Sequence, residues 1–109
     1  MAVVSGTYSS AQTNSVLVVP QGNKVIRVMQ VVFSAWGGTR LTLVSDPGGG
    51  GQFPITPPLH LPTAGGSLVL RLGRSFALAA ERAKALGITT SFSGAAADHS
   101  VIIWYEVVS

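Results

Sequence analysis

Apolar residues in this chain fall into short runs that turn residues separate. Turn signals such as Gln21-Gly22-Asn23, Trp36-Gly37-Gly38 and Asp46–Gln52 (DPGGGGQ) stand between runs rich in Val, Ile, Leu and Thr. This spacing is typical of β-strands in a sandwich or barrel, and it predicts an all-β fold of seven to eight strands. The predicted strands cover residues 16–19, 24–35, 39–45, 53–61, 67–72, 88–93 and 99–108.

Two of the predicted strands are apolar on both faces. In Lys24–Ala35 (KVIRVMQVVFSA) one alternate set is Val25, Arg27, Met29, Val31 and Phe33, and the other is Ile26, Val28, Gln30, Val32 and Ser34. His99–Val108 (HSVIIWYEVV) behaves in the same way. A strand covered on both sides has this pattern, so we expect one cover from the core and one from a neighbouring subunit. The candidate interface residues are Met29, Val31, Phe33, Trp36, Trp104 and Tyr105.

The stretch Phe76–Thr90 (FALAAERAKALGITT) differs from its surroundings because it is rich in helix formers. A helix there would be short and would bury mostly alanine, so it would gain little from packing. The β context therefore favours at most one short helical turn near residues 77–84, acting as a crossing between sheets. We expect a strand from about Leu86 onward.

Residues 1–14 are mostly small and polar, which predicts an N-terminal arm that is ordered only where something holds it. The arm is a candidate for docking or exchange between subunits. Residues 15–109 are then expected to form one domain, because domains of about 100–150 residues are the commonest size.

The composition supports an associating protein. Only 10% of the 109 residues are charged, whereas 47% are hydrophobic, and soluble domains average about 25% charged residues. One explanation for the few charges is a surface that stays soluble through Gly, Ser and Thr. The other is that neighbouring subunits cover part of the surface, and it is favoured because large exposed apolar areas usually mark interfaces.

The charge pattern limits which kinds of partner the chain is expected to bind. Seven basic and four acidic residues give a net charge of +3, but the bases are scattered and form no run, so direct binding of nucleic acid is not expected. No stretch reaches the roughly 20 apolar residues needed to cross a bilayer, and the N-terminus lacks a signal-peptide pattern. With no cysteine, disulfides and thiolate metal sites are excluded.

Few residues are suited to catalysis. Asp98-His99-Ser100 holds the residue types of a hydrolase triad, but neighbours along a strand point to opposite faces and cannot form its hydrogen-bonded chain. His60 and His99 lack the short spacings of metal ligands. The glycine loop at 46–52 lacks the lysine and following helix of a phosphate-binding loop. We therefore expect no enzyme activity, no metal and no cofactor.

From Lys24 to Val108 the chain resembles a group of small jelly-roll proteins encoded among the structural genes of tailed bacteriophages. The matching phrases are KVIRVMQVVFSA, TRLTLVS, LHLPTAGGSLVL, AKALGITTSFSGAA and VIIWYEVV. The chain departs from the pattern at DPGGGGQFPITPP and at Ala83. The resemblance implies a single-domain β-sandwich of jelly-roll type and a virion component, often a trimer, that binds capsid or tail proteins. It implies no catalytic residues.

Two hypotheses of function follow. The first is a non-enzymatic virion structural protein, a self-associating jelly-roll that decorates or stabilises the capsid or forms part of a spike or fibre. The alternative is a glycan- or receptor-binding jelly-roll module at a virion or cell surface, since jelly-rolls occur in lectins. Its sugar-binding face would be lined by aromatic residues, namely Trp36, Phe53, Phe76, Phe92, Trp104 and Tyr105. The scarcity of acids speaks against this alternative.

Overall fold

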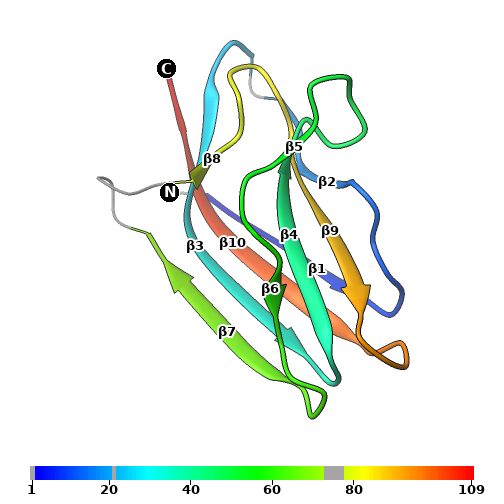
Figure 1. The fold of residues 1–109 in the computed structure, drawn as a ribbon. Coiled ribbons are helices and arrows are strands. Elements are labelled where there is room, and N and C mark those ends of the chain that lie inside the picture. The colour runs from blue at the N-terminus through cyan, green and yellow to red at the C-terminus, as the bar shows by residue number, and fades with distance from the viewer. Residues whose placement is uncertain (1, 21, 73–77) are drawn as a thin grey trace.

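The computed structural model describes residues 2–20, 22–72 and 78–109, and these residues form ten β-strands and no helix. The strands make two antiparallel five-stranded sheets that face each other as a sandwich (Figure 1). The all-β sandwich expected from the sequence is thus confirmed. The strands are β1 (Ala2–Tyr8), β2 (Ser15–Val18), β3 (Val25–Ala35), β4 (Thr39–Ser45), β5 (Phe53–Pro54), β6 (Leu59–His60), β7 (Gly66–Arg71), β8 (Leu78–Ala79), β9 (Leu86–Phe92) and β10 (His99–Val108).

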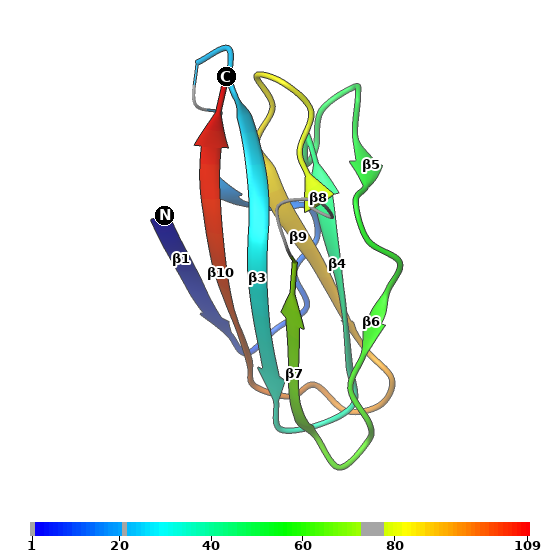
Figure 2. The same cartoon turned by 90° about the vertical axis from the view of Figure 1, so that its left-hand side faces the viewer.

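The strand order is that of a jelly-roll. Sheet A runs β1-β10-β3-β7, with β8 also pairing β3, and sheet B runs β2-β9-β4-β5, with β6 also pairing β4. The short strands β5 and β6 share one edge of β4, and β7 and β8 share one edge of β3 (Figure 2). Merging each of these two pairs leaves eight strand positions, four in each sheet, the number found in jelly-rolls.

The core lies between the two sheets and consists of the alternate residues of the long strands. Phe33, Ile103, Leu43 and Ile88 have no exposed surface, and each side chain of this size stabilises the fold by about 1.5–3 kcal/mol when fully buried. The predicted alternation of β4 is confirmed, because Leu41 and Leu43 are buried together. The described residues contain no helix long and apolar enough to span a membrane.

A β-bulge in β3 changes which residues face the core. Gln30 pairs with Trp104 of β10, but the next pair is Val28 with Tyr105, so Met29 is an extra residue. A bulge of this kind moves the alternation by one position. Ile26 and Val28 therefore share the inner face with Val31 and Phe33. Placing them on opposite faces was wrong, because the alternation was assumed to run unbroken through Met29.

The N-terminal segment also differs from the expectation. β1 lies within the predicted arm and pairs with β10 over all seven of its residues, so the sandwich begins at β1 and not at residue 15. The following residues are held to β9: Gln12 N–H donates to Thr90 Oγ1 at 2.9 Å, and Thr90 N–H donates to Gln12 O at 2.7 Å. The division into an arm and a domain is corrected accordingly. Exchange of this segment between subunits stays a prediction.

The helix-like stretch forms strand and turn instead. Residues 78–79 are β8, and residues 81–84 make a turn in which Lys84 N–H donates to Glu81 O at 3.1 Å. Ala80 and Ala83 donate their N–H groups to Ile26 O and Lys24 O. Because β3 takes these donors, no helical turn forms in residues 78–84, whereas Ala77 lies outside the described residues. The crossing between sheets and the strand beginning at Leu86 are confirmed.

Candidate interaction surfaces

His99 serves the core. It is the first residue of β10 and only 1% exposed. Its Nδ1 lies 3.0 Å from Ala97 O, which can only accept, so Nδ1 donates, and its Nε2 lies within hydrogen-bond distance of the Thr90 hydroxyl, at 3.0 Å. The rings of Tyr8, Phe33 and Phe92 surround it, with centroids 5.5–6.4 Å away.

Ser100 faces the other way, as the sequence predicted. It pairs with Ser34 of β3 and Thr7 of β1, on the side of sheet A that faces away from the core. His99 and Ser100 therefore cannot act on one substrate atom. Their neighbour Asp98 accepts no hydrogen bond from the ring, whose nitrogens lie against Ala97 O and Thr90 Oγ1, and its backbone oxygen accepts the N–H of Trp36 at 3.0 Å.

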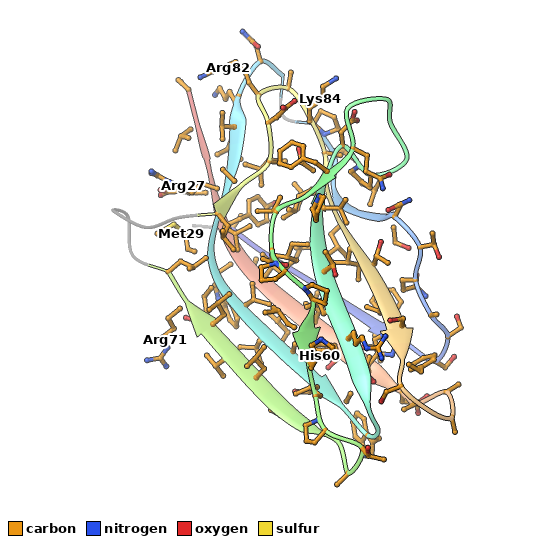
Figure 3. All side chains as sticks on the ribbon, viewed as in Figure 1. Arg27, Met29, His60, Arg71, Arg82 and Lys84 are labelled. Atoms are coloured by element: carbon orange, nitrogen blue, oxygen red, sulfur yellow. The ribbon has the colours of Figure 1, made fainter. Side chains whose placement is uncertain are left out.

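Several other charged side chains form structural contacts. Arg27 Nε donates to Glu106 Oε1 at 2.8 Å, as a cross-strand pair of β3 and β10. Asp46 Oδ2 accepts the N–H of Gly51 at 3.1 Å inside the glycine loop. His60 is exposed on β6 of sheet B (Figure 3), whereas His99 is buried in β10 of sheet A. Within residues 2–20, 22–72 and 78–109, no three His, Asp or Glu residues gather to hold a metal ion.

The interior holds no polar group ready for a ligand. Every buried side-chain nitrogen or oxygen of the described residues has a hydrogen-bond partner. Buried polar atoms without partners are the usual sign of a missing ligand or ion. Among the described residues, the side chains with polar atoms open to a ligand are therefore those at the surface.

The outer side of sheet A carries three cross-strand rows, which we call the sheet A face. Directly opposed residues of antiparallel strands point to the same side, and none of the row members is buried. Valines at both edges are prominently exposed, Val3 by 57% and Val69 by 52%. The rows are Val3–Trp104–Gln30–Arg71, Ser5–Ile102–Val32–Val69 and Thr7–Ser100–Ser34–Ser67.

The rows differ in chemistry. The middle row is apolar except for Ser5, the first row adds Val3 and Trp104, and the third row is made only of hydroxyl residues. Arg71 is the one charged residue of the three rows. Such a face is apolar in its centre and polar at one border, which is the arrangement of a protein interface.

The structure separates the six candidate interface residues. Val31 and Phe33 are wholly buried in the core, so their assignment to an interface is corrected. Tyr105 packs against the core from the same inner face, and Met29 is partly buried at the bulge (Figure 3). Trp104 lies on the sheet A face. Trp36 is 75% exposed in the connection between β3 and β4.

Four apolar residues of the sheet A face were missed by the sequence analysis as interface candidates: Val3, Val32, Val69 and Ile102. The alternation of β7 places Val69 on the opposite face of the strand from Leu68 and Leu70. What the alternation does not give is the strand order, which brings Val69, Val32 and Ile102 into one row.

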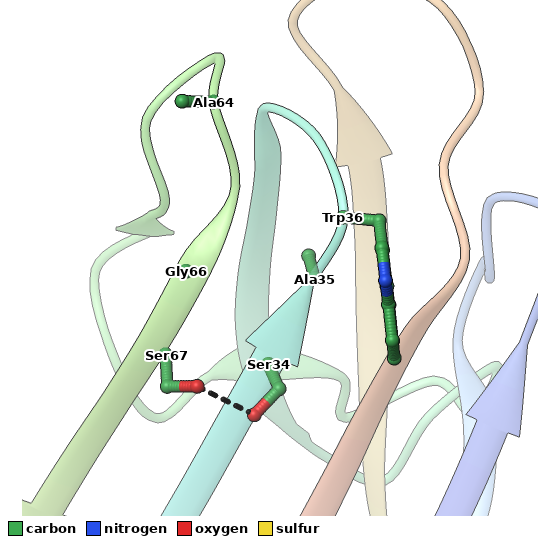
Figure 4. Close-up of a pocket in the computed structure, with 6 residues that line it drawn as sticks. All are labelled: Ser34, Ala35, Trp36, Ala64, Gly66 and Ser67. Atoms are coloured by element: carbon green, nitrogen blue, oxygen red, sulfur yellow. Dashed lines mark hydrogen bonds between the residues drawn. The ribbon is translucent and has the colours of Figure 1, made fainter.

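Two shallow hollows flank Trp36. The first, of about 380 Å³, is lined by Trp36 together with Ser34, Ala35, Ala64, Gly66 and Ser67 (Figure 4). Its two serine hydroxyls lie 3.0 Å apart and share a hydrogen bond. The second, of about 250 Å³, is lined by Trp36, Thr63, Ser93 and the small residues around them. All described lining residues of both hollows are neutral.

Comparison with known proteins adds little. No protein-family model matches this chain, and no curated protein is similar to it. A solved structure, the virus-like particle of the extra small virus of the giant freshwater prawn Macrobrachium rosenbergii, aligns with 95% of this chain and 75% of its own. The identity is 10% and the TM-score 0.36. These values carry no argument about function, which is argued below from the surfaces and the sequence.

Proposed function

We propose that this chain is a non-enzymatic structural protein of a tailed-phage virion. It self-associates, with a trimer as the expected form, and it decorates or stabilises the capsid or forms part of a spike or fibre. The sheet A face is the observation that carries the proposal, because it offers an apolar surface with a single charge. The sequence resemblance supplies the phage class and the capsid or tail proteins as partners.

The exposure of the sheet A face favours a subunit contact. Val3 and Val69 keep more than half of their surface in water, and each square ångström of apolar surface that becomes buried is worth about 25 cal/mol. Its three rows span about 20 Å along strands that rise about 3.4 Å per residue and about 19 Å across four strands about 4.8 Å apart, so the face presents on the order of 400 Å². That is about half of the roughly 800 Å² per partner of a standard interface.

Light scattering of the purified protein tests self-association. We expect the mass of a trimer at micromolar concentration, and we expect Val69→Glu to dissociate it, because the contact would have to remove water from a carboxylate in an apolar row. The control is Val16→Glu, which places the same charge on a valine of β2 that is 50% exposed and should leave the mass unchanged. A wild-type protein that stays monomeric contradicts the proposal.

The virion role is tested separately, at the level of the genome. A gene for a structural protein of a phage particle is expected beside genes for the major capsid or tail proteins. Flanking genes with neither kind of product would count against the virion assignment while leaving self-association standing.

A further inference from the structure

We propose that Trp36 and the two hollows beside it form a binding site for a neutral saccharide. The site serves a function other than self-association. It begins at the hydroxyl row, which is one border of the sheet A face, and extends over the connection between β3 and β4. The saccharide would stack on the indole and run across it, with one sugar unit in each hollow.

Trp36 is exposed on a backbone that is held in place. Its N–H donates to Asp98 O at 3.0 Å, which ties the connection to the start of β10. On the other side Gly65 packs so closely that a Cβ there would lie 2.6 Å from Ala35 O and 2.9 Å from the carbonyl carbon of Trp36. An aromatic ring on a fixed backbone loses little entropy when a ligand binds. The backbone that carries the indole is therefore preorganised.

The hollows match the chemistry of a sugar. A pyranose ring has an apolar C–H side that can stack on an indole, and hydroxyl edges that need both donors and acceptors. Ser34 and Ser67 in the first hollow and Thr63 and Ser93 in the second supply hydroxyls that can do either. Alanine and glycine fill the remaining wall, so a ring can approach the backbone closely.

Other ligand classes fit less well. An anionic ligand such as a nucleotide or an acidic peptide would find no cation among the described lining residues. A purely apolar ligand would strip water from the four hydroxyls without replacing their hydrogen bonds. The first hollow, at about 380 Å³, lies at the lower end of the roughly 300–1,000 Å³ of small-molecule sites. Together the hollows flank one indole, which favours a short oligosaccharide over a single sugar.

The experiment uses the full chain and a defined panel of probes. Neutral mono- and oligosaccharides built from glucose, galactose, mannose and their N-acetylated amines are immobilised and screened, with sialylated glycans as the anionic comparison. Binding is then titrated by fluorescence in Trp104→Phe, where Trp36 is the one remaining tryptophan of the two in the chain. We expect a saturable change in Trp36 emission and a preference for neutral glycans.

Variants assign the binding to the site. Trp36→Ala should weaken binding by about 5- to 140-fold, by analogy with base stacking on an aromatic, which is worth about 1–3 kcal/mol, at about 1.4 kcal/mol for each tenfold. Trp36→Tyr should keep part of the affinity, because a smaller aromatic platform remains. Ser67→Ala should weaken binding less than Trp36→Ala. Trp104→Phe serves as the control and should bind like the wild type in the array.

The outcomes separate this proposal from the proposed function. Absence of glycan binding at millimolar concentration, or binding that survives Trp36→Ala, overturns the saccharide site. If Trp36→Ala instead lowers the mass seen by light scattering, Trp36 is a contact between copies of this chain and the saccharide site is again overturned. Retention of the oligomer by Trp36→Ala, with loss of glycan binding, is the expected result.

Discussion

Individual glycines shape the end of the molecule that carries Trp36. Gly65 has φ of 83° and packs against the backbone of Ala35 and Trp36. Gly38 lies against Ser93, because a Cβ there would meet its hydroxyl at 2.1 Å. The position of Gly65 needs a residue without a side chain because backbone atoms are in the way, whereas a Cβ at Gly38 would require only the Ser93 hydroxyl to turn aside. The two hollows therefore depend on glycines as much as on the indole.

Replacement of Gly65 by alanine should lower the free energy of unfolding by about 1–3 kcal/mol, because the new Cβ meets backbone atoms and left-handed φ strains an L-residue. Urea unfolding followed by circular dichroism measures the change. Gly50→Ala is the matched control, since nothing lies within 4 Å of its added Cβ. Equal stability of the two variants would contradict the close approach.

Because of Tyr8, the stability of the folded protein should depend on pH in the alkaline range. Its ring lies near that of His99, with the centroids 5.6 Å apart, and burial raises the pKa of its hydroxyl above the ordinary 10.0. A raised pKa in the folded state favours the neutral phenol. The resulting stabilisation is complete below the unfolded pKa of 10.0 and is lost as the pH rises through the folded value.

Tyr8→Phe should therefore flatten the fall in stability above about pH 10. Urea midpoints at a series of alkaline pH values measure the slope, and the difference in tyrosinate absorbance between wild type and variant isolates Tyr8 from Tyr105. If the absorbance difference has its midpoint at or below the ordinary pKa of 10.0, the Tyr8 hydroxyl is not desolvated.

At the scale of elements, the bulge in β3 marks where this longest strand changes its edge partner. After Met29, residues 30–35 of the strand pair with β7, whereas Arg27 and Val28, which come before Met29, pair with β8. Leu72 N–H donates to Met29 O at 2.9 Å, just where the edge strand changes. The extra residue thus lies between the two parts of the edge, and both halves of β3 still face the core with the same side.

Deletion of Met29 should be tolerated, because Gln30–Trp104 and Val28–Tyr105 then become successive pairs of a regular ladder. The loss of the bond from Leu72 costs about 1–3 kcal/mol. Deletion of Val32 is the matched control, and it should abolish folding because it turns Val31 and the residues before it to the wrong face. Cooperative unfolding by circular dichroism distinguishes the two, and a folded Val32 deletion would contradict the assigned register.

Elements determined by local sequence patterns could be predicted, whereas those determined by contacts between distant segments could not. β4 and β10 were predicted closely because their alternation and bounding turns are local. β1 was missed because an exposed edge strand with Ser, Gly and Thr has the composition of an arm. Gly87 suits the end of a helix by composition, yet in β9 it is required because Ser15 O and the Pro47 ring approach it. The hollows beside Trp36 join segments distant in sequence, which no local pattern reveals.

At the scale of the whole molecule, most of the pairing joins distant parts of the chain. Ala2 pairs with Tyr105, and β2 pairs with β9. Loops must close before such contacts stabilise the fold, and all-β sandwiches with this property fold on the scale of milliseconds to seconds. Stopped-flow refolding of the wild type should give rates in that range, and microsecond folding would contradict the jelly-roll pairing.

The strand directions also give the molecule two unlike ends. β10 begins beside Trp36 and finishes opposite Val25, so the C-terminal end lies away from the β3–β4 connection, whereas Ala2 is opposite Tyr105, partway along the strand (Figure 2). The long dimension of the protein is 41 Å. A molecule tethered to a support by its C-terminal end would thus hold its exposed tryptophan outward, at the distal tip, without needing a hinge or an added stalk.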